Sequence, residues 1–438
     1  MKIKSISVEG LFGIFNHTVN FNSEDITIII GENGLGKTVL LEILHNMFAY
    51  RFDEIKSVKF ERISIRFTSG VEWLVQVIKD KKGSQLKIRN TEKSSNRWIS
   101  LDRYSKHASD SRFEQYSRRN RVYFDNDGNG NEETSVFIDH EYEDYLFHRQ
   151  MYARLNRKSN TDSLPNWFTD TLNEIKIDLI ETQRILTKHG KNKEKYKSTI
   201  MDCAEDLHKK LNIYSTEVQN ITTDLDSSFP NRVITKLNDK LELTNKEINE
   251  ELNKLNERRK ELSNVGLLTK LNIEDIQNLN KNEPSVLKFI SLYIEDSKSK
   301  LNPYKDIYGL LYLFLKTTNT RLKHKKISAC LNSGFKIQST ILKDEDDKPL
   351  EFSFEKLSSG EQHEIILFYK LIFSYEKGGI ILIDEPELSL HISWQNNFID
   401  DIKEIIAQNY LSIVIATHSP DLIGQHWNLT QELTGVDE

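Results

Sequence analysis

Two kinds of hydrophobic spacing alternate along the chain. Short apolar runs or alternating apolar and polar positions, typical of β-strands, occur in "KIKSISVEG", "DITIII", "KFERISIRFTS", "VEWLVQVIK", "SQLKIRN", "IKIDLI", "GIILIDE" and "LSIVIATH". Residues 325–354 read as further strands joined by turns. Segments with helical spacing lie between the strands, among them "TVLLEILHNMF", "YGLLYLFLK" and the stretches 361–375 and 394–408. Buried strands alternating with helices predict an α/β fold with a parallel or mixed sheet.

The spacing changes near residue 187. Between residues 196 and 225 the apolar positions alternate four and three apart, which is a coiled-coil pattern, at Ile200, Ala204, Leu207, Leu211, Tyr214, Val218, Ile221 and Leu225. We expect "SSFPNR" (227–232) to end this helix, and a second helix to follow with apolar residues seven apart at Ile234, Leu241, Ile248, Leu255 and Leu262. The insertion could be a projecting helical pair, or two amphipathic helices that lie flat on the body.

These patterns divide the chain into three parts. Residues 1–186 form a first α/β lobe, residues 187–299 a helical and coiled-coil insertion, and residues 300–438 a second α/β lobe.

A glycine-rich loop joins the apolar strand "DITIII" to the helix that follows it. It reads "GENGLGKT" and consists of Gly31, Glu32, Asn33, Gly34, Leu35, Gly36, Lys37 and Thr38. This is the phosphate-loop pattern in the context that it requires. Lys37 can bridge the β- and γ-phosphates of a nucleotide, and the Thr38 hydroxyl can bind Mg²⁺. The alternative is a chance glycine-rich turn, which the flanking strand and helix argue against.

Two later strands end in polar residues. Asp384 and Glu385 follow "IILI", at the strand edge where open α/β sheets bind ligands. Asp384 would hold Mg²⁺, and Glu385 would act as general base for the attacking water. His418 ends the strand "LSIVIAT" and could bond the γ-phosphate. Adjacent carboxylates can also simply start a helix, and a lone histidine is more often structural.

A second anion-binding turn lies in "FEKLSSGEQHEII". Ser359, Gly360 and Glu361 lead from a Ser/Gly turn into a helix, whose N-terminus suits an anion. The chain therefore carries two phosphate-binding turns, roughly 320 residues apart.

In this order, the phosphate loop, the Ser-Gly turn, the Asp-Glu pair and the histidine resemble the head of an ABC-type ATPase. They are most similar to the SMC-like and overcoming-lysogenization-defect-like branch, and the resemblance covers residues 1–186 and about 300–438. "DEPELSLH", with Leu388 and His391, resembles the D-loop of that branch. "IETQRIL" resembles its Q-loop, in which Gln183 would contact Mg²⁺ and the attacking water.

The resemblance implies a homo-oligomer, at least a dimer, with ATP and Mg²⁺ at the interface. Two heads would dock head to tail, so that Ser359 and Gly360 of one copy face the phosphate held by Lys37 of the other. Ser359 is expected to be the contacting hydroxyl, and Ser358 is the alternative. Residues 15–17 (Phe15, Asn16 and His17) lie where related heads contact the adenine base, or else they only close a strand turn.

Within this branch, "LIETQRIL", the insertion with "SSFPNR" and "KLSSGEQH" are most similar to the ATPase subunit of Septu antiphage systems (PtuA), including retron-associated forms. The insertion lacks the Cys-x-x-Cys of a zinc hook. The chain ends 20 residues after His418, so we expect no Toprim-type nuclease domain. The resemblance implies a partner nuclease in trans, of the HNH type, that the ATPase regulates.

Two alternative functions remain open. A sensor similar to those of PARIS systems would sequester a Toprim nuclease. An SMC-like repair clamp would bind DNA through the basic stretch Arg112–Arg121 and the turn Lys79–Lys82. The excess of acidic residues overall favours a solvated surface for both.

Composition narrows the class of protein further. The net charge is −6, which argues against a uniformly basic nucleic-acid binder. The two cysteines, Cys203 and Cys330, form no metal-binding pair. No apolar run approaches the ~18 residues needed to span a membrane, and the N-terminus reads as a strand instead of a signal peptide. We expect a cytoplasmic protein with no membrane partner.

Overall fold

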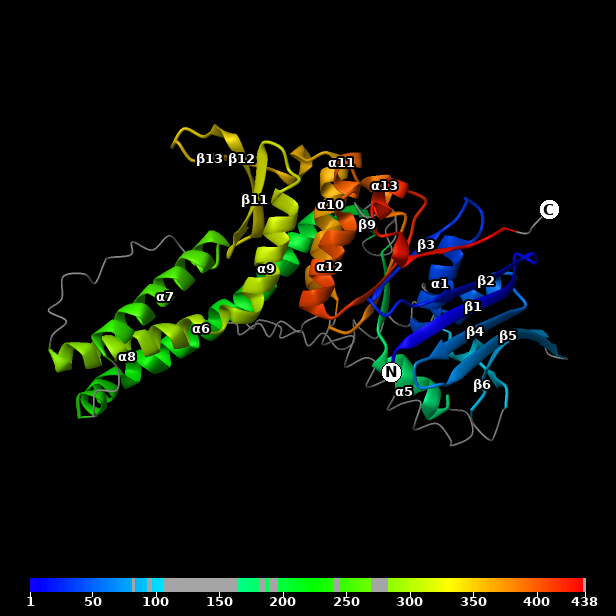
Figure 1. The fold of residues 1–438 in the computed structure, drawn as a ribbon, viewed down its shortest axis with the longest axis horizontal. Helices are drawn as coiled ribbons and strands as arrows, with labels where there is room; N and C mark the ends of the chain where they lie inside the picture. Colours follow the sequence, from blue (N-terminus) through cyan, green and yellow to red (C-terminus); the bar gives the residue numbers. More distant parts are fainter. Residues whose placement is uncertain are drawn as a thin grey trace, which may run out of the picture. The chain divides into compact units, whose positions relative to one another are not determined.

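A computed structural model describes residues 1–80, 83–92, 97–105, 164–180, 186–188, 196–238, 244–268, 283–375 and 377–435 (Figure 1). The chain divides into two compact units. The first comprises Met1–Ser23, Ile29–Leu179 and Gln431–Glu438, and the second Glu24–Ile28 and Ile180–Thr430. The three-part division at residues 186 and 299 stays a prediction.

The first unit is built on a six-stranded antiparallel sheet with the order β2-β1-β4-β5-β6-β7. Its elements are β1 (Ile3–Leu11), β2 (Phe15–Asn20), α1 (Lys37–Phe48), α2 (Phe52–Ser57), β4 (Arg62–Phe67), β5 (Glu72–Asp80), β6 (Gly83–Asn90), β7 (Ile99–Ser100) and α5 (Asn166–Glu174). The strands predicted in "VEWLVQVIK" and "SQLKIRN" are confirmed, and they pair as a hairpin, with Asp80 opposite Gly83 at its closed end.

Aromatic side chains hold the helices of this unit on its sheet. Trp73 of β5 is fully buried, and its ring lies 4.8 Å from that of Phe67 and 4.9 Å from that of Phe168 on α5. Phe48, in the last turn of α1, stacks on the same indole at 6.1 Å. Large aromatic side chains bury much apolar area, so this cluster fixes α1, and with it the loop that precedes α1, on the sheet.

The second unit combines parallel strands, an antiparallel sheet and long helices. β15 lies between β3 and β14, and β14 and β15 run parallel, with Asp384 opposite Ala416 at their carboxyl ends. β11, β12 and β13 form an antiparallel sheet of three strands, as the turns between residues 325 and 354 predict. The α/β fold class is therefore confirmed.

The remaining elements have the following bounds: β3 (Ile26–Ile30), β8 (Ile177–Ile180), β9 (Leu186–Lys188), β10 (Tyr196–Ser198), α6 (Thr199–Asn238), α7 (Asn245–Asn264), α8 (Pro284–Leu301), α9 (Tyr304–Asn319), β11 (Lys325–Cys330), β12 (Gly334–Lys343), β13 (Pro349–Phe352), α10 (Ser359–Tyr369), the π-helix η4 (Lys370–Ser374), β14 (Ile380–Asp384), the 3-10 helix η5 (Pro386–Ser389), α11 (Ile392–Gln395), α12 (Phe398–Asn409), β15 (Ser412–Ala416), α13 (Pro420–Ile423) and β16 (Thr430–Glu432).

The long helix α6 corrects one prediction. It runs for 40 residues straight through "SSFPNR", so the expected break is wrong, and Ile234 belongs to this helix instead of the next one. The predicted seam is otherwise observed. Ile200, Ala204, Leu207 and Leu211 are buried, and the four later positions are partly buried. The second helix, α7, begins only at Asn245, where Thr244 and Glu247 form a capping box.

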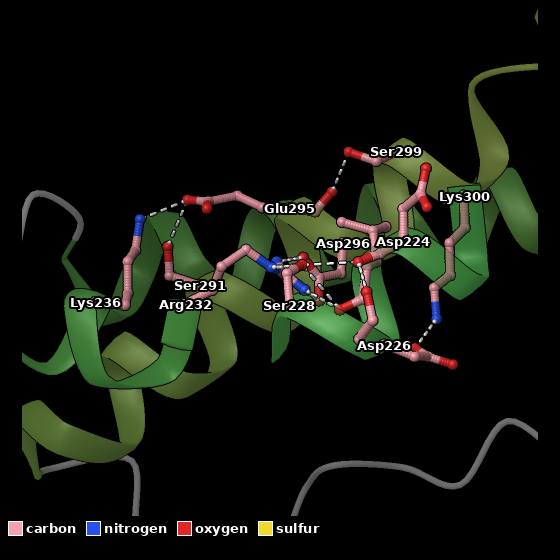
Figure 2. Close-up of polar contacts among 12 residues, drawn as sticks. Asp224, Asp226, Ser228, Arg232, Lys236, Ser291, Glu295, Asp296, Ser299 and Lys300 are labelled. Carbon is pink, nitrogen blue, oxygen red and sulfur yellow. Dashed lines mark hydrogen bonds and ion pairs between the residues drawn. The ribbon is translucent and has the colours of Figure 1, made fainter. Parts of the chain in front are cut away.

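Side-chain hydrogen bonds flank Pro230, where α6 continues without a break. A proline removes one backbone hydrogen bond and crowds the carbonyl of the preceding turn. Ser228 Oγ donates to the Asp224 carbonyl at 2.8 Å, and Arg232 Nη2 donates to the Leu225 carbonyl at 2.8 Å. Arg232 also pairs with Asp296 of α8, as Figure 2 shows. These donors bond to two carbonyls in the turn before the proline, and the Arg232–Asp296 pair ties the far half of α6 to α8.

The two halves of α6 have different neighbours. Near its start, Gly334 of β12 lies against the Ala204 carbonyl, and Tyr369 of α10 donates to Asp206 at 2.5 Å. Its second half pairs with α8 through Lys236–Glu295 and Lys300–Asp226, at 2.7 and 3.0 Å (Figure 2). α7 packs on the other helix of this pair, α8. A helical arm fits these contacts better than two helices lying flat.

Within the part of the chain that the structure describes, no helix combines the length and hydrophobicity needed to span a membrane.

Candidate functional site

The glycine-rich loop of the first unit has the backbone that a phosphate cradle needs. Gly31, Gly34 and Gly36 all have positive φ angles, of 155°, 90° and 89°. A Cβ atom on Gly36 would lie 2.6 Å from Leu11 Cδ2, and one on Gly31 would lie 3.0 Å from the Leu433 carbonyl oxygen. Only glycine adopts these angles in that space without strain, so the loop geometry is specified by the sequence.

Lys37 closes this loop from within. It is the first residue of α1 and is 5% exposed, and its Nζ donates to the carbonyls of Gly31 at 2.7 Å and Glu32 at 3.0 Å. Gly36, the residue that caps α1, contributes no side chain to the helix N-terminus. The ammonium group and the N-terminal end of α1 are therefore both held at one short loop, which favours an anionic ligand.

Two of the three residues considered for the adenine base make hydrogen bonds within the first unit. His17 is 3% exposed, and its Nε2 donates to the Leu35 carbonyl of the glycine-rich loop at 2.8 Å. Asn16 Oδ1 accepts from the Gly10 backbone N–H at 2.8 Å. Phe15 stacks on His17 with ring centroids 5.6 Å apart. This favours the alternative that these residues close the turn between β1 and β2.

The predicted carboxylates lie at the end of β14 in the second unit. Asp384 is 8% exposed and is the last residue of the strand. Glu385 follows with φ 41° and ψ 56°, a left-handed conformation that is uncommon outside glycine, and its N–H donates to the Ala416 carbonyl at 2.9 Å. Such strain persists where the surrounding structure enforces it, often at functional sites. Its carboxylate lies 4.0 Å from His418 Nδ1, so the second unit brings these two predicted residues together.

The structure adds Glu387 to this group. Its side chain is 5% exposed, and Oε1 accepts from the Thr417 hydroxyl at 2.7 Å, the His418 backbone N–H at 2.8 Å and His418 Nδ1 at 3.1 Å. Glu387 was not among the predicted site residues, although it lies within "DEPELSLH", because nothing in that motif shows which of its side chains meets His418.

The Ser-Gly turn begins helix α10. Ser358 is the N-cap, and its Oγ accepts from the Glu361 N–H while Glu361 Oε2 accepts from the Ser358 N–H at 2.7 Å. The Glu361 carboxylate also pairs with Lys325 at 2.8 Å. Ser359 is the first helical residue and is exposed. The Ser358 hydroxyl is thus committed to capping, which favours Ser359 as the hydroxyl that meets a ligand.

A buried charged cluster lies beneath this turn. Arg321, just past α9, pairs with Glu364 of α10 at 2.6 Å and also with Asp401 of α12, and its guanidinium stacks on Phe368 at 4.7 Å. Burial raises the pKa of Glu364 to about 8, although Arg321 acts in the opposite direction. Burial also raises the pKa of Asp401. One guanidinium cannot neutralise two carboxylates, so the cluster favours a protonated Glu364, which is the more buried of the two acids.

We expect this cluster to make stability depend on pH. The folded protein keeps the Glu364 proton where the unfolded chain loses it, so the free energy of unfolding falls as the pH rises from 4.5 to about 8. The expected loss between pH 6 and pH 8 is about 2 kcal/mol. Glu364→Gln mimics the protonated acid and should remove most of this dependence. Urea unfolding of both proteins at the two pH values measures it, and equal pH dependence would contradict the assignment.

Gln183 and the basic stretch Arg112–Arg121 lie outside the described residues. The phosphate loop belongs to the first unit, while Asp384, Glu385, His418 and the Ser-Gly turn belong to the second. Each group is formed by contacts within its own unit.

A glycine-cradled loop before a helix, with a lysine enclosed by the loop carbonyls, defines a nucleotide-binding protein of the P-loop class. The chain matches the AAA ATPase domain family over residues 1–423. It therefore belongs to this family and is an ATPase of the AAA type. The predicted class, an α/β ATPase head with a helical coiled-coil insertion, is confirmed.

Among solved structures, the chain is similar to SMC head domains. The Smc head domain with an extended coiled coil bound to the C-terminal domain of ScpA, from Pyrococcus furiosus, has a TM-score of 0.38 and 13% identity, with 96% of this chain and 91% of that chain covered. The SMC head domain from Thermotoga maritima has a TM-score of 0.36 and 9% identity, with 99% and 95% covered. No curated protein matches the sequence.

Proposed function

We propose that the protein is an ATP-driven switch whose active centres are completed by a second copy of the chain. The observation that carries this proposal is the construction of the Ser-Gly turn. Ser358 and Glu361 cap each other, Lys325 fixes Glu361, and Ser359 is left exposed at the start of α10. Such a turn is prepared for an anion, although the chain's own phosphate loop is a separate anion site. A twofold arrangement would give each turn a nucleotide held by the other copy.

In this proposal each residue has a defined task. Lys37 and the loop residues 31–38 bind the phosphates of ATP. Glu385 accepts a proton from the attacking water, and His418 donates a hydrogen bond to the γ-phosphate. Ser359 and Gly360 of the other copy stabilise the same phosphate. Thr38, Asp384 and Gln183 are the proposed metal ligands, and Mg²⁺, when bound, neutralises charge on the phosphates.

The residues present fit this substrate and metal. The loop glycines leave room for phosphate oxygens, because a Cβ atom on Gly34 would have no other atom within 4 Å. Lys37 already lies within hydrogen-bond distance of two carbonyls that a phosphate would replace as partners. In the second unit, the buried Asp384 offers the hard oxygen ligand that Mg²⁺ prefers.

We further propose that the switch acts in antiphage defence of the Septu type and regulates an HNH nuclease supplied in trans. The support is the sequence resemblance of "LIETQRIL" and "KLSSGEQH" to the ATPase subunit of those systems. Co-expression with the neighbouring genes, followed by co-purification with and without ATP, tests this part. Isolation of the chain as a monomer without any partner in the presence of ATP would contradict it.

Mixing two inactive variants tests the shared active centre. Lys37→Ala disables the phosphate loop, and Ser359→Glu repels phosphate while an acidic residue in the first helical turn remains favourable for folding. In an equal mixture, half of the dimers are mixed and each mixed dimer has one intact centre, so about a quarter of the wild-type turnover should return.

The matched control replaces the second variant by a chain carrying both changes, Lys37→Ala and Ser359→Glu, which leaves no intact phosphate loop in any dimer. That mixture should stay inactive. If the first mixture also stays inactive although both variants fold and associate, the shared centre is wrong.

A further inference from the structure

One carboxylate oxygen of Glu387 accepts hydrogen bonds from two atoms of His418. The same carboxylate oxygen, Oε1, accepts from the His418 backbone N–H at 2.8 Å and from the ring Nδ1 at 3.1 Å. An exposed histidine normally samples several rotamers, and the His418 side chain is 42% exposed. Since one acceptor binds both the backbone and the ring of His418, the rotation of the side chain relative to its own backbone is restricted.

Neighbouring residues fix the carboxylate in turn. Thr417 Oγ1 donates to Glu387 Oε1 at 2.7 Å and accepts from the Ser419 N–H at 3.0 Å. Ser419 Oγ donates to Gln395 Oε1 at 2.7 Å, and Gln395 Nε2 donates to the Leu390 carbonyl at 3.2 Å. This network joins the turn after β14 to the turn after β15, and Glu387 is its only carboxylate among these residues.

The charge of Glu387 calls for an explanation beyond packing. Its residue is 7% exposed, and Oε2 is buried with no hydrogen-bond partner among the described residues. A buried carboxylate with one unpartnered oxygen is costly to keep. Three donors converge on the other oxygen, one of which is the ring of a residue predicted to contact phosphate.

We propose that Glu387 is the positioning residue of His418. It accepts from Nδ1–H of the imidazole and so leaves Nε2 as the atom that meets the phosphate, where Nε2–H can donate when both ring nitrogens carry a proton. The hydrogen bond made by one ring nitrogen sets the protonation and orientation of the other. This inference rests on the proposed role of His418 in ATP hydrolysis, and in it Glu387 acts on the phosphate only through His418.

The first test needs no nucleotide. Ring ¹⁵N spectra of the full chain, with His418→Asn identifying the resonances, report which ring nitrogen carries a proton. We expect Nδ1 to carry a proton in the wild type, where it donates to the Glu387 carboxylate. In Glu387→Ala this acceptor is absent, so we expect Nδ1 to be unprotonated. Glu387→Met keeps the length of the side chain without an acceptor oxygen and serves if the alanine variant does not fold. Identical His418 ring signals in the wild type and in the folded variant would overturn the proposal.

The second test is a double-mutant cycle on ATP hydrolysis. We expect Glu387→Gln to lower kcat by about tenfold with KM for ATP nearly unchanged, because positioning acts on the phosphate in the transition state. The double variant with His418→Ala should be no slower than His418→Ala alone. Glu351→Gln, at an exposed pair with Lys336, is the matched control and should keep wild-type kcat.

The two tests separate this inference from the proposed function. If the wild type hydrolyses ATP but the effects of Glu387→Gln and His418→Ala multiply, Glu387 acts independently of His418 and the inference is wrong. If the wild type hydrolyses no ATP, the proposed function is wrong, while the ring spectra still decide whether Glu387 sets the state of His418.

Discussion

The Lys37→Ala variant should bind ATP about 100-fold more weakly and show no measurable hydrolysis. An ammonium contact to phosphate is a charge-assisted hydrogen bond, and the loss of two such bonds amounts to a factor of this size. The expected effect is large for a second reason. Lys37 Nζ also ties the carbonyls of Gly31 and Glu32 together, so its removal releases the loop that should surround the phosphates.

Titration with a fluorescent ATP analogue and a phosphate-release assay measure the two effects. The control is Lys56→Ala in the same unit, which breaks a partly exposed pair with Asp102 at 2.9 Å and lies outside the loop. It should bind ATP as the wild type does. Thermal unfolding of both variants excludes a general loss of structure. Wild-type affinity in a folded Lys37→Ala protein would remove Lys37 from the binding site.

The backbone of the phosphate loop could be predicted from the sequence because its main causes are local. Three glycines within eight residues allow the positive φ angles that the loop adopts, and Lys37 follows them directly. The strand ends could also be predicted from the sequence, since an apolar run followed by polar residues marks the edge of a sheet. Asp384, Glu385 and His418 therefore lie at strand ends as predicted.

The errors in the helical region have two different causes. "T-x-x-E" at Thr244 and Glu247 is a capping-box signal that marks the true start of α7, and the heptad count overlooked it. No local sequence signal, by contrast, indicated that α6 would continue through Pro230. The continuation depends on Asp296, more than 60 residues further along the chain, which pairs with Arg232. A local helix breaker was outweighed by a tertiary contact.

The candidate site likewise contains residues whose role could be predicted from the sequence and one whose role could not. Ser358 and Glu361 fit the pattern "S-x-x-E", so the commitment of Ser358 to capping is readable from the sequence. The role of Glu387 is not readable from the sequence, because it depends on Thr417 and His418. These residues approach Glu387 from another strand end 30 residues later. Local rules identify residues that shape their own loop, whereas residues that position others need the three-dimensional structure.

The Glu385→Gln variant should bind ATP with wild-type affinity and hydrolyse it about 100-fold more slowly or worse. The amide has the size of the carboxylate but cannot accept the proton of the attacking water. Lys37 and the glycine-rich loop are unchanged, so phosphate binding persists. Because ATP then stays in place, the proposed dimer should accumulate in its closed form.

Two measurements on this variant decide between a catalytic and a structural role for Glu385. Single-turnover phosphate release gives the rate of the chemical step, and light scattering after size exclusion with ATP or ADP gives the oligomeric state. Glu404→Gln, which breaks an exposed pair with Lys316 at 2.8 Å, is the matched control and should turn over normally. Turnover of Glu385→Gln at the wild-type rate would show that another group activates the water. Slow turnover without an ATP-dependent dimer would keep Glu385 as the base but reject ATP as the link between two copies.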